Sequence, residues 1–342
     1  MVKLPGIPGV VGFWRALAEI DPQAIALQAV QPVSIAIVGP PGAGKRTLRR
    51  ALLGLDHRGQ EPDARDAARV PILEVEPGKS LDWLPGANLY LFVVDGGRGV
   101  DAAEAAPARQ IESRGGRVLY VVNKADQLGA PEAFRYTAGA AFGVPPGERL
   151  ALAVATDPAN LGRELVPKMA NQLADRSLAM ARLLPGAREA VAQSLILEAS
   201  KANAQFSLVS SLPANLPVIG TLTALGADTL VLTKNQAMLV FKLAAVHGRA
   251  LDSKAQLAAE IAPVVGAAFA WRSVARTLVG LLPGMVSAVP KAAVSFAGTY
   301  VVGQSAHYYY RWGKRPHRQT IERFSSEAAQ LARRSVAALV GR

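Results

Sequence analysis

A short glycine-rich segment after an apolar run has the composition of a phosphate-binding loop. Residues 33–38 are apolar and β-branched, as a buried parallel strand should be. The pattern G-x-x-x-x-G-K then starts at Gly39 and continues with Gly42, Ala43, Gly44, Lys45, Arg46 and Thr47. Glycines let backbone N–H groups surround a phosphate, a following helix adds the positive end of its dipole, and a lysine at this position reaches the β- and γ-phosphates. The segment predicts nucleotide binding.

A second motif follows another buried strand and addresses the base. Residues 117–122 are apolar after Arg117 and lead into the sequence Asn123, Lys124, Ala125, Asp126. This N-K-x-D pattern resembles the guanine-specificity motif of GTPases. The resemblance implies that Asp126 accepts the two N–H donors of guanine, that Asn123 braces the phosphate-binding loop, and that the stem of Lys124 lies along the base. Residues 150–154 form one more strand, and the following Ala155 and Thr156 resemble the loop whose backbone touches guanine.

The motifs stand within an alternation of strands and helices. Strands are predicted at 33–38, 70–75, 89–95, 117–122 and 150–154, with helices near 45–55, 100–113, 131–142 and 160–174. Such alternation implies an α/β fold with a mostly parallel sheet, helices on both faces, and the ligand at the carboxyl ends of the strands. Residues 33–170 resemble an Era-like GTPase domain of the translation-factor-related class. We predict N-terminal helices in 1–32 and a P-loop GTPase-like domain in 33–175.

The positions that normally hold magnesium in such domains are altered. Arg46 follows the P-loop lysine where a serine or threonine is expected, and Thr47 is about 100° further round the helix. Val75 stands where a D-x-P-G turn would have its aspartate, before a switch-like loop of Glu76, Pro77 and Gly78. A shift of one residue would bring Glu74 or Glu76 near, but the spacing argues against it. No metal site is predicted.

Three interpretations of these losses stay open. In the first, the protein binds GTP or GDP with little or no hydrolysis, and the Arg46 guanidinium replaces part of the metal's charge. In the second, Arg46 points to solvent and the nucleotide binds weakly. In the third, a partner or a second protomer completes the site. Function then follows as a guanine-nucleotide-binding regulator or scaffold, with two alternatives: an active GTPase with unusual magnesium ligation, or an assembly protein that uses the G fold to oligomerise.

Residues 176–342 are predicted to be all α-helical. Helices are expected near 187–211, 218–247, 254–280, 285–310 and 318–340, because alanine and leucine dominate between breaks at prolines and glycines. The phrases LTKNQA (232–237) and HGR (247–249) resemble the bacterial helical domain of unknown function numbered 697, over about 205–310. That resemblance implies association with a GTPase domain and, in some members, with membranes. The uncharged runs 202–227 and 292–310 are either buried helices or membrane-associated segments.

The charge of the protein is uneven. Residues 1–160 carry equal numbers of basic and acidic side chains, so the net charge of +12 falls in 161–342, half of it in 305–342. The aromatic and basic residues of this tail are Tyr308, Arg311, Trp312, Lys314, Arg315 and Arg318. They suit an anionic membrane surface or an acidic protein, nucleic acid being the less favoured partner, or else a solvated basic face. The absence of cysteine excludes disulfides and thiolate sites, and we expect a cytoplasmic, oligomeric protein, peripheral at the inner face of the membrane.

Overall fold

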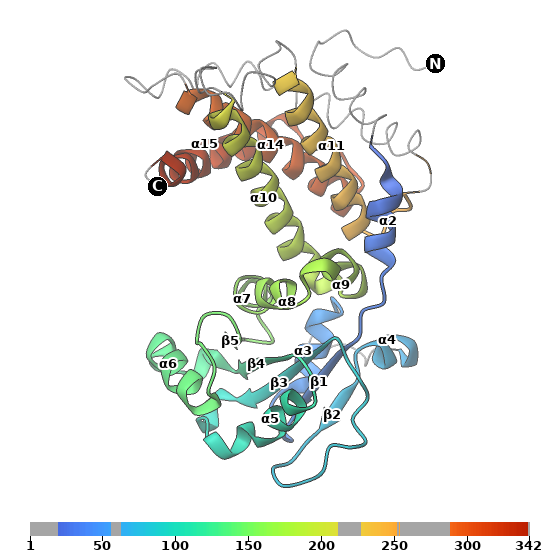
Figure 1. Cartoon of the computed structure of the whole chain (residues 1–342), viewed down its shortest axis with the longest axis vertical. Coiled ribbons are helices and arrows are strands. Elements are labelled where there is room, and N and C mark those ends of the chain that lie inside the picture. Colours follow the sequence, from blue (N-terminus) through green and yellow to red (C-terminus); the bar gives the residue numbers. More distant parts are fainter. Residues whose placement is uncertain (1–19, 56–62, 211–226, 252, 254–287, 341–342) are drawn as a thin grey trace. The chain divides into compact units, whose positions relative to one another are not determined.

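The computed structural model describes residues 20–55, 63–210, 227–251, 253 and 288–340, which form two compact units, Gln28–Val191 and a unit that includes Ala192–Arg342 (Figure 1). The helix predicted at 254–280 lies outside the described residues. Residues 1–19, where the first of the N-terminal helices is expected, also lie outside them. The same is true of residues 211–226, near the start of the segment that resembles the helical domain of unknown function.

The first unit contains a five-stranded parallel sheet. Its strands are β1 (Ile35–Gly39), β2 (Ile72–Glu74), β3 (Leu89–Asp95), β4 (Val118–Asn123) and β5 (Leu150–Leu152), in the order β2-β1-β3-β4-β5. All four pairings are parallel. The predicted α/β fold is confirmed, and each predicted strand is present within two residues of its expected ends.

Helices cover both faces of the sheet, which explains why its strands are continuously apolar. The helices of this unit are α3 (Lys45–Leu52), α4 (Ala64–Arg69), α5 (Ala106–Ser113), α6 (Pro131–Phe142), α7 (Pro158–Glu164), α8 (Val166–Gln172) and α9 (Ser177–Leu183). Helices α5 and α6 pack on one face and α3 and α8 on the other. Alternate side chains of a strand point to opposite faces, so a sheet covered on both sides needs apolar residues at every position.

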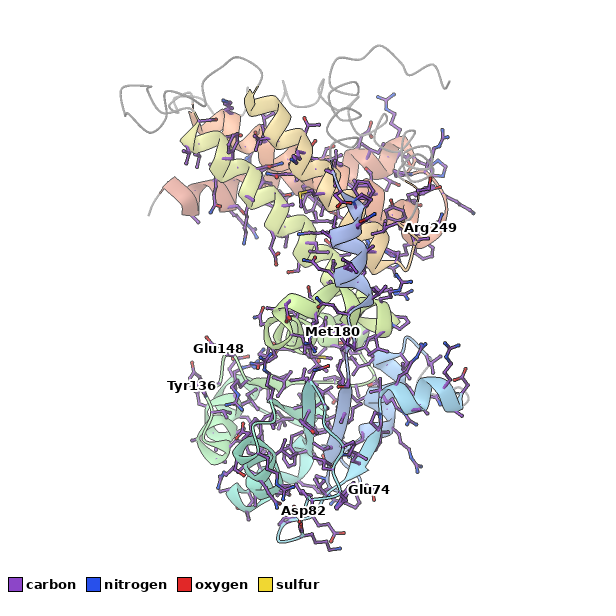
Figure 2. All side chains as sticks on the ribbon, turned by 45° about the vertical axis from the view of Figure 1, so that its right-hand side comes forward. Glu74, Asp82, Tyr136, Glu148, Met180 and Arg249 are labelled. Carbon is purple, nitrogen blue, oxygen red and sulfur yellow. The ribbon has the colours of Figure 1, made fainter. Side chains whose placement is uncertain are left out.

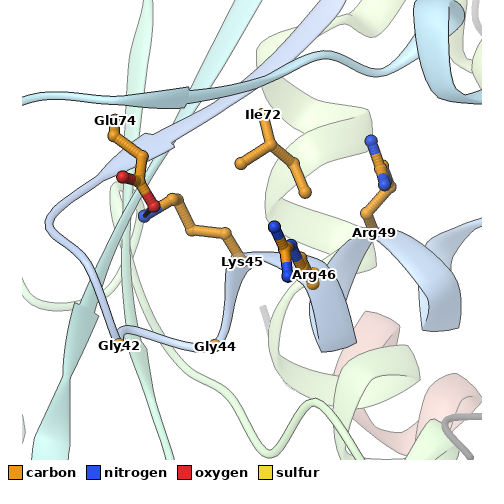
Figure 3. Close-up of a pocket in the computed structure, with 7 residues that line it drawn as sticks. All are labelled: Gly42, Gly44, Lys45, Arg46, Arg49, Ile72 and Glu74. Atoms are coloured by element: carbon orange, nitrogen blue, oxygen red, sulfur yellow. Dashed lines mark ion pairs between the residues drawn. The ribbon is translucent and has the colours of Figure 1, made fainter.

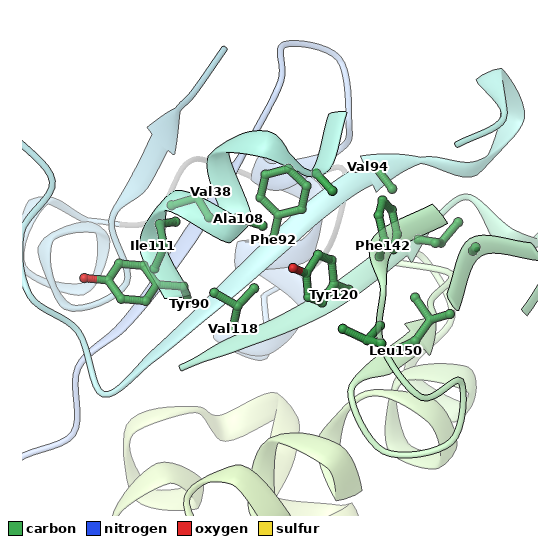
Figure 4. Close-up of a cluster of buried hydrophobic side chains, with 14 of the residues drawn as sticks. Val38, Tyr90, Phe92, Val94, Ala108, Ile111, Val118, Tyr120, Phe142 and Leu150 are labelled. Atoms are coloured by element: carbon green, nitrogen blue, oxygen red, sulfur yellow. The ribbon is translucent and has the colours of Figure 1, made fainter. Parts of the chain in front are cut away.

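The larger aromatic residues of this core lie on the α5–α6 face (Figure 4). Tyr120 is fully buried, stacks on Phe142 with ring centroids 4.9 Å apart, and meets Phe92 edge to face at 5.9 Å. Figure 2 shows how side chains fill the space between sheet and helices, and it places Glu74 and the loop residue Asp82 at the same end of the unit. The loops that follow β1, β4 and β5, at the carboxyl ends of the strands, extend from this packed sheet.

The second unit is helical, as predicted. It contains α11 (Ala227–Val246), α14 (Ala288–Trp312), α15 (Arg318–Val340) and most of α10 (Arg188–Val209); α2 (Pro22–Val30) precedes the sheet. Gly303 of α14 brings three helices together, because a Cβ there would lie 2.8 Å from Ile196 of α10 and 3.0 Å from Leu239 of α11. Among the described helices, none is both long enough and apolar enough to cross a bilayer.

Polar side chains also link the helices of this unit. The buried Asn203 on α10 donates to Thr299 Oγ1 on α14 (2.8 Å), and its Oδ1 accepts from Asn235 Nδ2 on α11 (2.7 Å). Buried polar groups are costly unless they are hydrogen-bonded, so these partners fix the helices against one another. The uncharged runs that suggested a membrane segment therefore include Asn203 and Thr299, whose polar groups are hydrogen-bonded to other helices of this unit.

Candidate functional site

The phosphate-binding loop starts where the order of the strands reverses. The chain leaves β1 for β2 on one side and then crosses to β3 on the other, so the carboxyl end of β1 lies at the switch point where parallel α/β sheets bind ligands. Gly39 ends β1 with φ of 150°, and a Cβ on it would lie 2.1 Å from the carbonyl oxygen of Val93 in β3. Only glycine fits at this crossing.

The loop then turns into α3 through a second required glycine. Gly44 is the N-cap of α3 with φ of 87°, and a Cβ on it would lie 2.2 Å from Asn123 Nδ2. The backbone N–H groups of Lys45, Arg46 and Thr47 are the first of the helix, so they have no carbonyl partner within it. The loop therefore presents backbone donors and the positive end of a helix dipole, which suits an anion.

Lys45 lies buried beneath this loop. Its Nζ donates to the carbonyl oxygens of Gly39 (2.9 Å) and Pro40 (2.6 Å) and is 3.5 Å from Glu74 Oε1. Burial lowers the pKa of Lys45, and the nearby Glu74 carboxylate offsets part of that effect. A phosphate would favour the charged form of this lysine in the same way that Glu74 does.

A pocket of about 590 Å³ opens beside Lys45 (Figure 3). Its lining residues are Gly42, Gly44, Lys45, Arg46, Arg49, Ile72 and Glu74. Figure 3 shows Arg46 and Arg49 projecting from α3 on the side that faces Ile72 of β2. Arg46 is exposed, yet its side chain lines the pocket, so it is placed to meet a ligand there. Thr47 is not among the lining residues.

Glu74, rather than Glu76, is the carboxylate next to the P-loop lysine. The strand register pairs Glu74 with Gly39, whereas Val75 is buried and its amide donates to the Gly39 carbonyl (3.3 Å). Glu76 is exposed and pairs instead with Lys79 at 2.7 Å. The sequence spacing, which argued against Glu74, was therefore a poor guide, because the last residue of a strand can turn its side chain toward the neighbouring loop. Pro77 and Gly78 are exposed.

The N-K-x-D motif lies against the phosphate-binding loop. Asn123 is buried at the end of β4; its Nδ2 donates to the Ala43 carbonyl (2.9 Å) and its Oδ1 accepts from the Ala155 amide (3.1 Å). Lys124 has a φ of 59°, which is unusual outside glycine, and its Nζ lies 3.2 Å from the Gly42 carbonyl. The side chain of Asn123 thus joins the loops after β1, β4 and β5.

The carboxylate of the motif and the loop after β5 lie at the surface. Asp126 is exposed in a 3-10 turn that follows β4, and Thr156 is also exposed, whereas Ala155 is buried. Asn160 holds the β5 loop in place, because its Oδ1 accepts from the Val154 amide at 2.7 Å. Nothing in the sequence pattern had singled out Asn160.

Asp95 is a further contact that the motifs had not predicted. This residue ends β3, directly beside Asn123 in the register, and its Oδ2 lies 2.6 Å from Lys124 Nζ. Partial burial tends to raise the pKa of Asp95, but hydrogen bonds from Lys124 and the Gly97 amide, with the charges of Lys124 and Arg98, lower it overall. Asp95 therefore holds Lys124 in its left-handed conformation over the P-loop.

The described lining residues of this pocket offer few of the groups that magnesium prefers. Magnesium prefers carboxylate, hydroxyl and water oxygens, whereas these residues include three cationic side chains and one carboxylate, Glu74, which lies 3.5 Å from Lys45. Over the part of the chain that the structure describes, no cluster of three or more acidic or histidine side chains could hold a metal.

The aromatic and basic residues of the tail gather at the corner between α14 and α15. Five exposed residues form what we call the basic corner: Arg311, Trp312, Lys314, Arg315 and Arg318. Trp312 is 57% exposed. The Arg311 guanidinium lies over the Trp312 ring at 4.9 Å, and Arg318 pairs with Glu322 at 2.9 Å. Tyr308 is instead half-buried against Phe324.

Comparison with known proteins gives a partial similarity. Over 136 residues the chain is 34% identical to the protein named GTPase Der of Thioalkalivibrio sulfidiphilus (strain HL-EbGR7), which covers 32% of this chain and 29% of that protein. The chain thus spans less than a third of the length of this relative. The chain matches no family model. The resemblance of residues 205–310 to the helical domain of unknown function stays a prediction.

Proposed function

We propose that this protein binds GTP or GDP and acts as a regulator or scaffold with little or no hydrolysis of its own. The observation that carries this proposal is the buried Asn123, which links the P-loop at Ala43 to the β5 loop at Ala155. Such a link would keep the loop for the phosphates and the loop for the base in one fixed arrangement around a single ligand. The partial similarity to a protein named GTPase Der supports the same nucleotide.

Guanine is the base that Asp126 would select. Its carboxylate is exposed beside a motif fixed to the P-loop by Asn123 and Lys124. A carboxylate accepts two parallel N–H donors, which guanine offers and adenine lacks. Discrimination by hydrogen bonds of this kind is strong, because the wrong base leaves polar groups unpaired.

Weak hydrolysis follows from the chemistry of the pocket. Phosphoryl transfer relies on a metal to neutralise the charge on the β- and γ-phosphates and on a group that orients the attacking water. By sequence position, Arg46 and the buried Val75 stand where related domains hold the metal, and the carboxylate that does line the pocket, Glu74, is 3.5 Å from Lys45. The pocket can therefore bind phosphates without the parts that catalysis needs.

The decisive experiment measures binding of GTP, GDP and ATP by calorimetry, with Asp126→Asn as the informative variant. An asparagine there offers a donor toward the exocyclic N2 of guanine and suits the carbonyl of xanthine, so GTP should bind at least about tenfold more weakly and xanthosine triphosphate more tightly. Equal binding of GTP and ATP by the unmodified protein would contradict the proposal. GTP hydrolysis that Lys45→Ala abolishes would show an active GTPase instead. A protein that binds no nucleotide would favour the assembly alternative.

We also propose that the basic corner binds an anionic membrane surface. Four exposed cations stand close to Trp312 in the sequence, and one of them, Arg311, lies over its ring. An indole ring beside cations suits the headgroup layer, where each cation near anionic lipid is worth about 1 kcal/mol. Vesicles with a third of anionic lipid should retain the protein, and neutral vesicles should not. The variant Lys314→Gln/Arg315→Gln should lose most of this binding, whereas Arg333→Gln/Arg334→Gln, with the same loss of charge on exposed residues of α15, should keep it. If both double variants lost vesicle binding equally, the binding would be a general effect of positive charge and the membrane proposal would fail. An RNA or an acidic protein would then be tested as the partner.

A further inference from the structure

We infer that Arg46 and Arg49 together take the place of the magnesium ion, so that this protein binds a nucleoside di- or triphosphate without any divalent metal. This inference rests on the proposed function. It concerns the charge that holds the phosphates and is separate from the recognition of the base.

The two arginines are set by the helix to act on one ligand. They are three residues apart on α3, so their side chains leave the same face of the helix. Both line the pocket with Gly42, Gly44 and Lys45. Both side chains leave α3 on the side that faces Ile72 of β2 (Figure 3). Arg46 belongs to the first turn of α3, where the backbone donors for a phosphate are also found.

The charges of the pocket agree with this assignment. The lining residues that the structure describes include three cations and one anion, Glu74, which lies 3.5 Å from Lys45. Positive side chains thus outnumber negative ones among these residues, which suits an anionic ligand. Guanidinium groups donate paired hydrogen bonds to phosphate oxygens and keep their charge at every working pH.

The same residues disfavour a metal in this place. A divalent cation in this pocket would lie near Lys45, Arg46 and Arg49, and Glu74, the carboxylate among the described lining residues, is engaged with Lys45. Like charges this close repel, and the hydroxyl that would normally ligate the metal is replaced by Arg46. The sequence suggested Arg46 alone; the structure adds Arg49 and places both in the pocket.

The test measures binding of GDP, GTP and inorganic pyrophosphate by calorimetry, in excess EDTA and in excess Mg²⁺. We expect the affinities in the two conditions to differ by less than about threefold, which is a small change on the scale of one hydrogen bond. The variants Arg46→Gln and Arg49→Gln should each weaken binding in EDTA by about tenfold or more, since each loses a charge-assisted hydrogen bond. Arg163→Gln, which removes an exposed arginine of α7 outside the pocket, should change nothing.

A second variant separates charge from folding. Arg46→Ser restores a hydroxyl at this position, so its binding should fall in EDTA and recover in part when Mg²⁺ is added. Thermal unfolding midpoints of the Arg46 variants should match the parent, because Arg46 is exposed, and binding by Arg49→Gln is measured at a temperature where that variant is folded. Binding by the parent protein that requires Mg²⁺, or arginine variants that bind normally in EDTA, would overturn the inference. Pyrophosphate binding without GTP preference would leave the inference standing and remove the guanine assignment. Absence of binding for all three ligands would remove both.

Discussion

The side chain of Asn123 donates a hydrogen bond to the carbonyl oxygen of Ala43 at 2.9 Å, although 80 residues separate the two in sequence. The same amide accepts from Ala155 and lies against Gly44, where no Cβ would fit. The positions of the P-loop and of the N-K-x-D turn are therefore set by one buried group.

Asn123→Ala should weaken both the fold and nucleotide binding. It leaves the Ala43 carbonyl and the Ala155 amide without their partner, and each buried unsatisfied group costs about 1–3 kcal/mol. We expect the free energy of unfolding in urea to fall by about 2–4 kcal/mol, with a loss of GDP affinity that stays when the protein is kept folded at low temperature. Asn160→Ala is the control, because it disturbs only the β5 loop near Val154. Equal losses of affinity in both variants would argue against a bracing role for Asn123.

The pair of Asp95 and Lys124 should make stability depend on pH in the acid range. The pKa of Asp95 is lowered below its ordinary value of 3.8 in the folded chain, so its stabilising contribution is present above that value. The contribution is lost as the pH falls through the lowered pKa. Because Lys124 is about a third exposed, we expect only about 0.5–1 kcal/mol at neutral pH.

The measurement compares unfolding of the parent and Asp95→Asn in urea between neutral pH and about pH 3, where carboxylates titrate. The difference in free energy of unfolding should be present at neutral pH and shrink as the pH falls. A matched variant, Asp157→Asn at the N-cap of α7, changes a carboxylate of the same unit that does not touch Lys124. A difference for Asp95→Asn that is the same at every pH would show that its charge does not stabilise the fold.

Much of the α/β unit was predictable because its patterns are local. Continuous apolar strands indicated a sheet covered on both faces, and the glycines of the P-loop lie at positions that require them: Gly39 by a close approach to Val93, and Gly44 by a positive φ and by contact with Asn123. Sequence spacing could not show that Glu74 turns toward Lys45, since that depends on the register between β1 and β2.

Contacts between distant elements were also beyond the sequence patterns. Asp95 meets Lys124 because β3 and β4 are neighbours in register, and Arg49 joins the pocket because α3 presents it one turn after Arg46. Neither residue belongs to a motif. In the helical unit, prolines and glycines predicted the helices well, but not that Asn203 and Thr299 would meet inside the bundle.

Glu74→Gln should tighten nucleotide binding. The carboxylate of Glu74 lines the pocket and pairs with Lys45, so it both repels phosphate and competes for the lysine. Its side chain is 65% exposed, which limits the effect by solvent screening, and we expect a gain of about two- to fivefold in affinity for GDP. Glu76→Gln is the matched control, because Glu76 pairs with Lys79 outside the pocket. A loss of affinity, above all one seen only with Mg²⁺, would show that Glu74 ligates a metal instead.

Gly303→Ala should destabilise the helical unit despite the better helix propensity of alanine. A Cβ at Gly303 would lie 2.8 Å from Ile196 Cγ1 and 3.0 Å from Leu239 Cδ2, so α10 or α11 must move. Overpacking costs about 1–3 kcal/mol, and the propensity gain returns at most about 1 kcal/mol. The net loss should appear as a lower urea midpoint for the helical signal. Gly162→Ala in α7 is the control, since its Cβ would be 3.7 Å from Ala190, an ordinary contact, and it should raise stability slightly. If both variants gained stability alike, the three helices would not meet at Gly303 as closely as described.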